Sequence, residues 1–187
     1  MQFEKDDQFR EGLHNAHNLL AHLRTGGTLL PITTGVRLEE GEVEYTRSEV
    51  DCLRYAPLGD GSYSRTTFLG LGSFQALAVT ALGSAAWNSH RRRVAAQEAA
   101  PRWRGIGRVG LTVTSGRILM FQQMTWESIW FPQVFQMVPQ LEHYQLDILF
   151  EGAPAVRYHG PSVPFVSVML FYLLYNQEVA LPALGSG

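Results

Sequence analysis

The sequence predicts an α+β protein: a small antiparallel β-sheet or barrel with an N-terminal helix, an inserted Ala-rich helix and a C-terminal capping helix. Three observations predict this class. Apolar residues recur at helical spacing near the N-terminus, alternating segments joined by short turns fill the second half, and an apolar run long enough for a helix follows the last of them. With 187 residues, of which 45% are hydrophobic, the chain is large enough to bury the core of one domain.

The first 35 residues are expected to form an amphipathic helix and a linker. Apolar residues recur there in steps of three and four, which places them on one helical face: Phe9, Leu13, Ala16, Leu20 and Leu23. The helix is predicted over residues 5–24, because Gly26 and Gly27 favour its end. The linker 28–35 should be extended.

Residues 36–180 are expected to form the β-rich domain, and 181–187 a tail. In the clearest segment, Val109–Gln123, two alternating runs flank Ser115-Gly116, which predicts a hairpin with a two-residue turn and a positive φ at Gly116. Further strands are predicted over 42–55, 62–68, 127–131, 144–150 and 155–158, and a closing helix over 163–175.

An Ala-rich segment without proline predicts a helical insertion over 73–100. Small residues recur there every four positions and would let another backbone approach closely, which favours self-association: Gly72, Ala76, Thr80 and Ser84. Residues 67–87 are uncharged, a length close to that of a membrane span, although several are polar. Packing within the chain, membrane contact and a membrane span all remain open for this segment.

One resemblance extends over residues 36–178. The segment Trp103–Val134 carries T-x-x-R at Thr114–Arg117 between two strands and W-x-x-I at Trp126–Ile129. In this rhythm, and in its closing helix, the chain resembles bacterial PH-like or GRAM-like proteins. The resemblance implies a small antiparallel barrel, from which the insertion departs. The basic signature by which some PH domains hold phosphoinositide headgroups is not found in the sequence.

The basic residues concentrate in one part of the sequence, as a run of three followed by two that flank Trp103: Arg91, Arg92, Arg93, Arg102 and Arg104. Such a group can bind an anionic ligand or the headgroups of an anionic membrane. It can equally be a solvated helix end, because cations are favoured near a helix C-terminus and three consecutive helical residues point 100° apart. We favour the helix end.

Composition makes several functions improbable. A net charge of −2 and an isoelectric point near 6.3 make nucleic-acid binding unlikely. The single cysteine, Cys52, excludes an intramolecular disulfide and a multi-cysteine zinc site. The acidic, polar N-terminus is unlike a signal peptide, so a cytoplasmic location is expected, with membrane association as a possibility.

No motif assembles an active site. Gly105–Gly110 matches G-x-G-x-x-G, but a hairpin instead of a helix follows it, so no dinucleotide site is expected. His14 and His17 share a helical face without a carboxylate to complete a metal site, and His143 and His159 near acidic residues are common at strand ends. We therefore predict no catalytic residue, no metal and no cofactor.

The sequence thus favours a non-enzymatic binding or scaffold module that acts through contacts with a protein partner or with its own copies. The alternative is a peripheral membrane module that uses the basic residues and the apolar insertion against anionic lipid.

Overall fold

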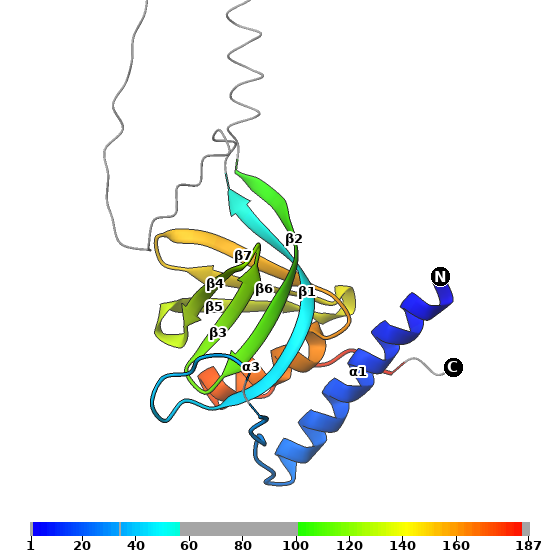
Figure 1. Cartoon of the computed structure of the whole chain (residues 1–187). Coiled ribbons are helices and arrows are strands. Elements are labelled where there is room, and N and C mark those ends of the chain that lie inside the picture. The colour runs from blue at the N-terminus through cyan, green and yellow to red at the C-terminus, as the bar shows by residue number, and fades with distance from the viewer. Residues whose placement is uncertain (1, 34, 57–100, 185–187) are drawn as a thin grey trace, which may run out of the picture. The chain divides into compact units, whose positions relative to one another are not determined.

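The computed structural model describes residues 2–33, 35–56 and 101–184 (Figure 1). The chain divides into two compact units. The first consists of Met1–Tyr55 and Trp103–Gly187 and contains nearly all of the described residues, and the second is Ala56–Arg102. The strand expected over 62–68 and the helix over 73–100 lie outside the described residues. So do the small-residue stripe at Gly72, Ala76, Thr80 and Ser84 and the basic residues Arg91, Arg92 and Arg93.

The described part is α+β, with a seven-stranded antiparallel sheet in the order β4-β3-β2-β1-β7-β6-β5. Its elements follow in sequence as α1 (Gln2–Arg24), β1 (Glu44–Ala56), β2 (Arg102–Thr114), β3 (Arg117–Gln122), β4 (Thr125–Trp130), the 3₁₀ turn η1 (Phe131–Gln133), β5 (Val134–Gln140), η2 (Leu141–His143), β6 (Gln145–Phe150), β7 (Ala153–His159) and α3 (Val163–Tyr175). The order makes β4 and β5 the two edges.

The sheet curls so that strands far apart in its order meet across the concave face. The hydroxyl of Tyr158 on β7 lies 3.1 Å from the sulfur of Met120 on β3, although β1 and β2 separate these strands. Arg54 on β1 forms an ion pair with Glu127 on β4 in the same way. Because Tyr158 and Met120 are buried, the curled sheet encloses much of the hydrophobic core.

The two helices pack against each other, and Figure 1 shows α3 across one end of the curled sheet with α1 beside it. The predicted apolar face of α1 is confirmed. Leu13, Ala16 and Leu20 of α1 are buried, as are Val166, Met169 and Leu170 of α3, whose bounds match the prediction. Phe9, Leu23, Leu173 and Leu174 are partly buried. Helix α1 begins at Gln2, earlier than expected.

The hairpin of β2 and β3 is confirmed, but the predicted positive φ at Gly116 is wrong, because it is not among the positive-φ glycines. The side chain of Thr114 makes this turn instead. Its hydroxyl oxygen accepts hydrogen bonds from the amides of Gly116, at 3.2 Å, and Arg117, at 3.0 Å. The turn is thus stabilised by hydrogen bonds to a threonine side chain and does not need the positive φ of a primed turn.

Two strand assignments differ from the prediction. β2 begins at Arg102, seven residues before the alternating pattern, in a glycine-containing stretch with Gly107 at φ 97°. β5 was not predicted because it contains Pro139 and lacks clear alternation. Proline is tolerated in β5 because the strand lies at the edge of the sheet.

Candidate binding surface on the β3–β4 hairpin

Strands β3 and β4 form a tight hairpin with a strained turn. All six residues of each strand pair in one regular register, from Arg117↔Trp130 to Gln122↔Thr125. The two residues between them, Gln123 and Met124, both have positive φ, 46° and 62°. This is the geometry of a primed turn, which glycine or asparagine usually occupies, and each other residue costs on the order of 1–3 kcal/mol there. The pairing of β3 with β4 therefore keeps Gln123 and Met124 in a backbone conformation that these two residue types do not favour.

The hairpin presents large apolar side chains to solvent. Met124 is 87% exposed and Trp126 is 47% exposed. The rings of Phe121 and Trp126 lie opposite each other across the two strands, 4.8 Å apart. We refer to Phe121, Met124 and Trp126 as the hairpin patch. Exposed aromatic residues gathered on one element are typical of interaction surfaces.

A glycine on the neighbouring strand β2 lies beside the patch. Gly110 pairs with Phe121, and a β-carbon at Gly110 would lie 3.5 Å from the β-carbon of Phe121. The amide side chain of Gln122 also reaches across β2 and donates to the carbonyl of Ile106. The hairpin is thus joined to β2 along its length, so the patch is presented on a fixed support.

The backbone of β4 leaves a row of polar groups at the sheet edge. The amide of Phe131 donates to the carbonyl of Gly116 in the β2–β3 turn, hence toward β3. Because N–H directions alternate along a strand, the amides of Glu127 and Ile129 also point to β3. The amides of Trp126, Ser128 and Trp130 point away from β3, toward the edge of the sheet. The amide of Trp130 donates a hydrogen bond to the side-chain oxygen of Gln133 at 3.1 Å. Within the described residues, no strand pairs with this side of β4.

At the opposite end of the same face, a buried ion pair fixes the loop before β1. Arg117, whose side chain is 9% exposed, donates two hydrogen bonds to Glu42, at 3.0 and 2.9 Å, and its guanidinium lies over the ring of Trp130. Burial raises the pKa of Glu42. The hydroxyl of Thr114, the amide of Glu39 and Arg117 lower it by more, so the pKa lies below its ordinary value. Thr114 and Arg117, the T-x-x-R positions, therefore have a structural role here.

Other charged residues in the described part also join strands. Asp147 on β6 accepts two hydrogen bonds from Arg157 on β7, at 2.6 and 2.7 Å, which raises the pKa of Arg157. The same guanidinium lies 4.2 Å from the ring centre of Trp103.

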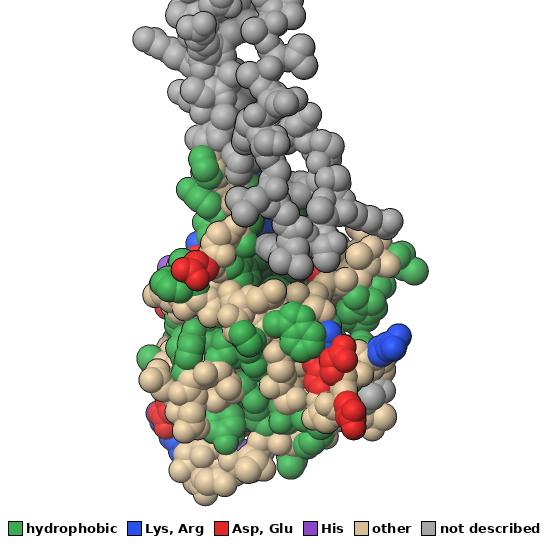
Figure 2. Space-filling model, turned by 90° about the vertical axis from the view of Figure 1, so that its left-hand side faces the viewer, with side chains coloured by type: hydrophobic (Ala, Val, Ile, Leu, Met, Phe, Trp, Pro, Cys, Tyr) green, Lys and Arg blue, Asp and Glu red, His purple; other side chains and the backbone are tan. Residues whose placement is uncertain are grey.

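Of the basic residues proposed from the sequence, Arg102 is exposed and Arg104 is half-buried at the start of β2. On the face in Figure 2, charged side chains lie mainly near the margins of the described part.

Two potential nucleophiles of the described part, Cys52 and Tyr158, are buried in the core. Cys52 is 1% exposed, and burial raises the pKa of its thiol to about 12. Tyr158 is fully buried, and burial raises its pKa well above the ordinary value. A thiol that stays protonated at neutral pH is a weak nucleophile. Both residues therefore act as core residues.

The histidines proposed from the sequence have separate surroundings. His14 is exposed, and the ring of His17 donates to the carbonyl of Pro182 at 2.8 Å. Within the described residues, no three His, Cys, Asp or Glu side chains are placed to hold a metal ion. A carboxylate–histidine pair does form, but His159 lies 3.9 Å from Asp51 on the neighbouring β1, and not beside the acidic residues near it in sequence.

The glycine motif Gly105–Gly110 lies inside β2, and β3 follows it. The element after the motif is therefore a strand, and not the helix that a dinucleotide site requires there.

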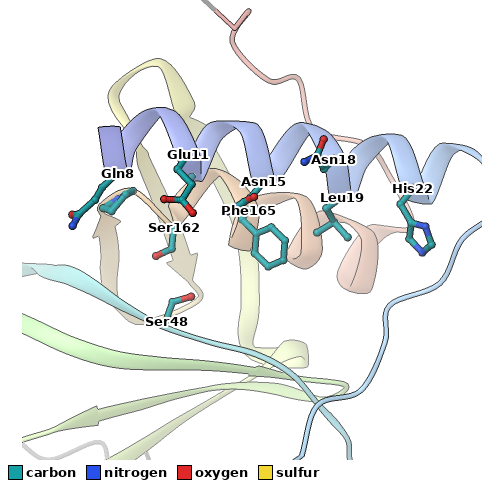
Figure 3. A pocket seen from close by; sticks show the side chains of 11 residues that line it. Gln8, Glu11, Asn15, Asn18, Leu19, His22, Ser48, Ser162 and Phe165 are labelled. Atoms are coloured by element: carbon teal, nitrogen blue, oxygen red, sulfur yellow. The ribbon is translucent and has the colours of Figure 1, made fainter. Parts of the chain in front are cut away.

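A second candidate is the groove beneath α1, with a volume of about 630 Å³ (Figure 3). Asn15 and other polar residues of α1 line one wall, and Ser48, Ser162 and Phe165 line the other. The two titratable residues that line it, Glu11 and His22, lie toward opposite ends in Figure 3. The groove offers hydrogen-bonding groups but does not bring an acid and a base together.

The chain matches no protein-family model, no curated protein and no solved structure. Among the described residues, no helix has both the length and the apolar character that crossing a membrane requires.

Sequence analysis did not identify the hairpin patch. Phe121 lies in the predicted hairpin Val109–Gln123, but Met124 and Trp126 lie between this hairpin and the strand predicted over 127–131, where their exposure was not considered. The available signal was the pair Gln123-Met124 between two predicted strands, where a turn residue such as glycine is expected.

Proposed function

We propose that this protein is a non-enzymatic binding module that docks a protein partner, or another copy of itself, on the hairpin patch. The observation that carries the proposal is the exposure of Met124 and Trp126 on a strained but firmly paired hairpin. Strain retained at a surface turn is typical of a functional site. Tryptophan and other large side chains supply most of the binding free energy at interfaces.

We also propose that the domain is PH-like. The T-x-x-R and W-x-x-I segments lie on the adjacent strands β2 to β4, the sheet curls on itself, and a C-terminal helix lies across one end, which agrees with the resemblance in the sequence.

A protein partner fits the hairpin patch better than a membrane does. Two described arginines on the neighbouring strands β1 and β2 have acidic partners: Arg54 binds Glu127, and Arg108 lies 3.7 Å from Glu49. Anionic lipid is attracted by unpaired cations. An aromatic surface beside an open strand edge instead offers both apolar contact and backbone hydrogen bonds, which another polypeptide can match.

A photo-crosslinking amino acid at position 126 tests the proposal in cells that express the full chain. We expect light-dependent protein adducts at Trp126, identified by mass spectrometry. The matched control places the same amino acid at Leu30, an apolar residue that is 73% exposed on the linker before β1. Adducts at 126 well above those at 30 support the proposal, and equal yields at the two positions contradict it.

Sedimentation with lipid vesicles distinguishes membrane binding from protein docking. The purified chain should sediment equally little with neutral and with anionic phosphatidylserine vesicles at low salt. Binding to anionic vesicles that is lost at high salt and in Trp126→Lys would assign the patch to lipid and overturn the protein-docking proposal.

A further inference from the structure

We infer that the partner of the hairpin patch is a second copy of this chain, and that two copies pair antiparallel through their β4 strands, with Ser128 at the two-fold axis. This inference rests on the proposed function and names its partner. Three observations support it: the β4 edge has no pairing strand among the described residues, the N–H and C=O groups of alternate β4 residues point outward, and only some registers bring compatible side chains together.

The two edges of the sheet differ in how they are protected. β5 has a bulge between Val134 and Gln136 and contains Pro139, which has no N–H to donate. Bulges and prolines at an edge prevent pairing with another chain. β4 has neither, and its regular register keeps it straight enough for pairing. Its only charged residue, Glu127, is held toward the concave face by Arg54. Within the part of the chain that the structure describes, the β4 edge is therefore open to a further strand.

Three self-pairing registers of β4 join two different outward-facing residues, and they are centred on Glu127, on Ser128 and on Ile129. Residues whose N–H and C=O groups point outward must face each other as hydrogen-bonded pairs, and these are Trp126, Ser128 and Trp130. One register places Glu127 opposite Glu127 of the second copy, at the short separation of a non-hydrogen-bonded pair. Like charges directly opposite each other are destabilising. The register centred on Ile129 pairs only Ser128 with Trp130, whereas the register centred on Ser128 pairs all three outward-facing residues and so forms more hydrogen bonds.

The register centred on Ser128 is self-complementary. It places Trp126 of each copy opposite Trp130 of the other on the outer face, with the two serines between them. Aromatic cross-strand pairs are among the stabilising ones, and two such pairs would form by symmetry. The amide of Trp126 would donate to the carbonyl of Trp130 in the second copy without displacing Gln133 from the Trp130 amide. The pairing would cover Trp126, which is 47% exposed in a single chain.

Sedimentation of the full chain tests the inference. We expect a mass of twice 20.9 kDa at tens of micromolar, shifting toward the single-chain mass on dilution. Trp126→Lys should remain at the single-chain mass over the whole range, because it places a charge in each aromatic pair. Leu30→Lys, which changes an exposed apolar residue away from β4, should behave as the wild type. Circular dichroism checks that both variants are folded.

A cysteine scan on β4 tests the register. In the dimer the α-carbons of the two residues at position 128 would lie about 5.5 Å apart, which suits a disulfide. Ser128→Cys should therefore give a covalent dimer under mild oxidation. Thr125→Cys, on the same strand, should not, since its two copies would lie roughly 20 Å apart at about 3.3 Å per residue. The native Cys52 is buried and does not interfere.

The outcomes separate this inference from the proposed function. A wild-type chain at the single-chain mass up to 100 μM, or a dimer that Trp126→Lys leaves unchanged, would overturn the β4 dimer. The proposed function still stands in the first case if position 126 crosslinks to a different protein in cells. If position 126 gives no adduct above the control, both are wrong.

Discussion

Replacing Arg117 by methionine should destabilise the protein by about 3–5 kcal/mol at pH 7, because it leaves the Glu42 carboxylate buried without its partner. The two side chains are only 9% and 5% exposed, so solvent replaces little of the lost interaction. Methionine retains apolar contact near Trp130, which limits the loss of packing. For a chain of this length the melting temperature should fall by roughly 6–20 °C. Arg117→Met combined with Glu42→Gln should lose less than Arg117→Met alone.

The pH dependence identifies the cause. The pKa of Glu42 is lower in the folded protein than its ordinary value of 4.5, so its contribution to stability is present above pH 4.5 and is lost as the pH falls through the folded-state pKa. The difference between wild type and Arg117→Met should therefore shrink as the pH falls, because protonation of Glu42 removes the charge that Arg117 binds. Denaturant titrations at pH 7 and about pH 3.5 measure this. An equal difference at both pH values would refute the ion-pair reasoning and assign the loss to packing.

Three further predictions concern the core and the helices. Leu170→Ala should cost about 2–5 kcal/mol, because Leu170 is fully buried in α3, and an unchanged thermal transition would contradict this. Gly12→Ala, which favours most helices, should lower the melting temperature, since its β-carbon would lie 1.8 Å from the carbonyl oxygen of Pro161. Cys52 should resist a thiol reagent at pH 8 until denaturant is added, because the pKa of its thiol is raised to about 12; rapid reaction of the native protein would show that it is accessible.

Local patterns in the sequence predicted α3 and the hairpin of β2 and β3. The bounds of α3 and the pairing of β2 with β3 follow from apolar spacing and from a two-residue turn, both of which are local signals. β5 was missed for the same reason, since Pro139 and an irregular pattern hide a strand that only its place at an edge permits.

The binding surface depended on information that local patterns lack. Whether Trp126 is buried or exposed depends on β4 lying at the edge of the sheet, and the strand order is set by pairings over long distances in the sequence. The ion pairs of Arg117 with Glu42 and of Arg54 with Glu127 likewise join segments more than 70 residues apart. Periodicity along one strand cannot reveal them.

Hydrogen exchange along β4, followed by nuclear magnetic resonance, tests the central claim most directly. The amides of Glu127 and Ile129 point to β3 and should be protected at every concentration. Those of Trp126 and Ser128 point to the open edge, so they should exchange quickly in dilute protein and become protected as the concentration rises and β4 pairs with its copy. Fast exchange of Trp126 and Ser128 at all concentrations would contradict the pairing. Slow exchange of both in dilute protein would show that the edge is not open.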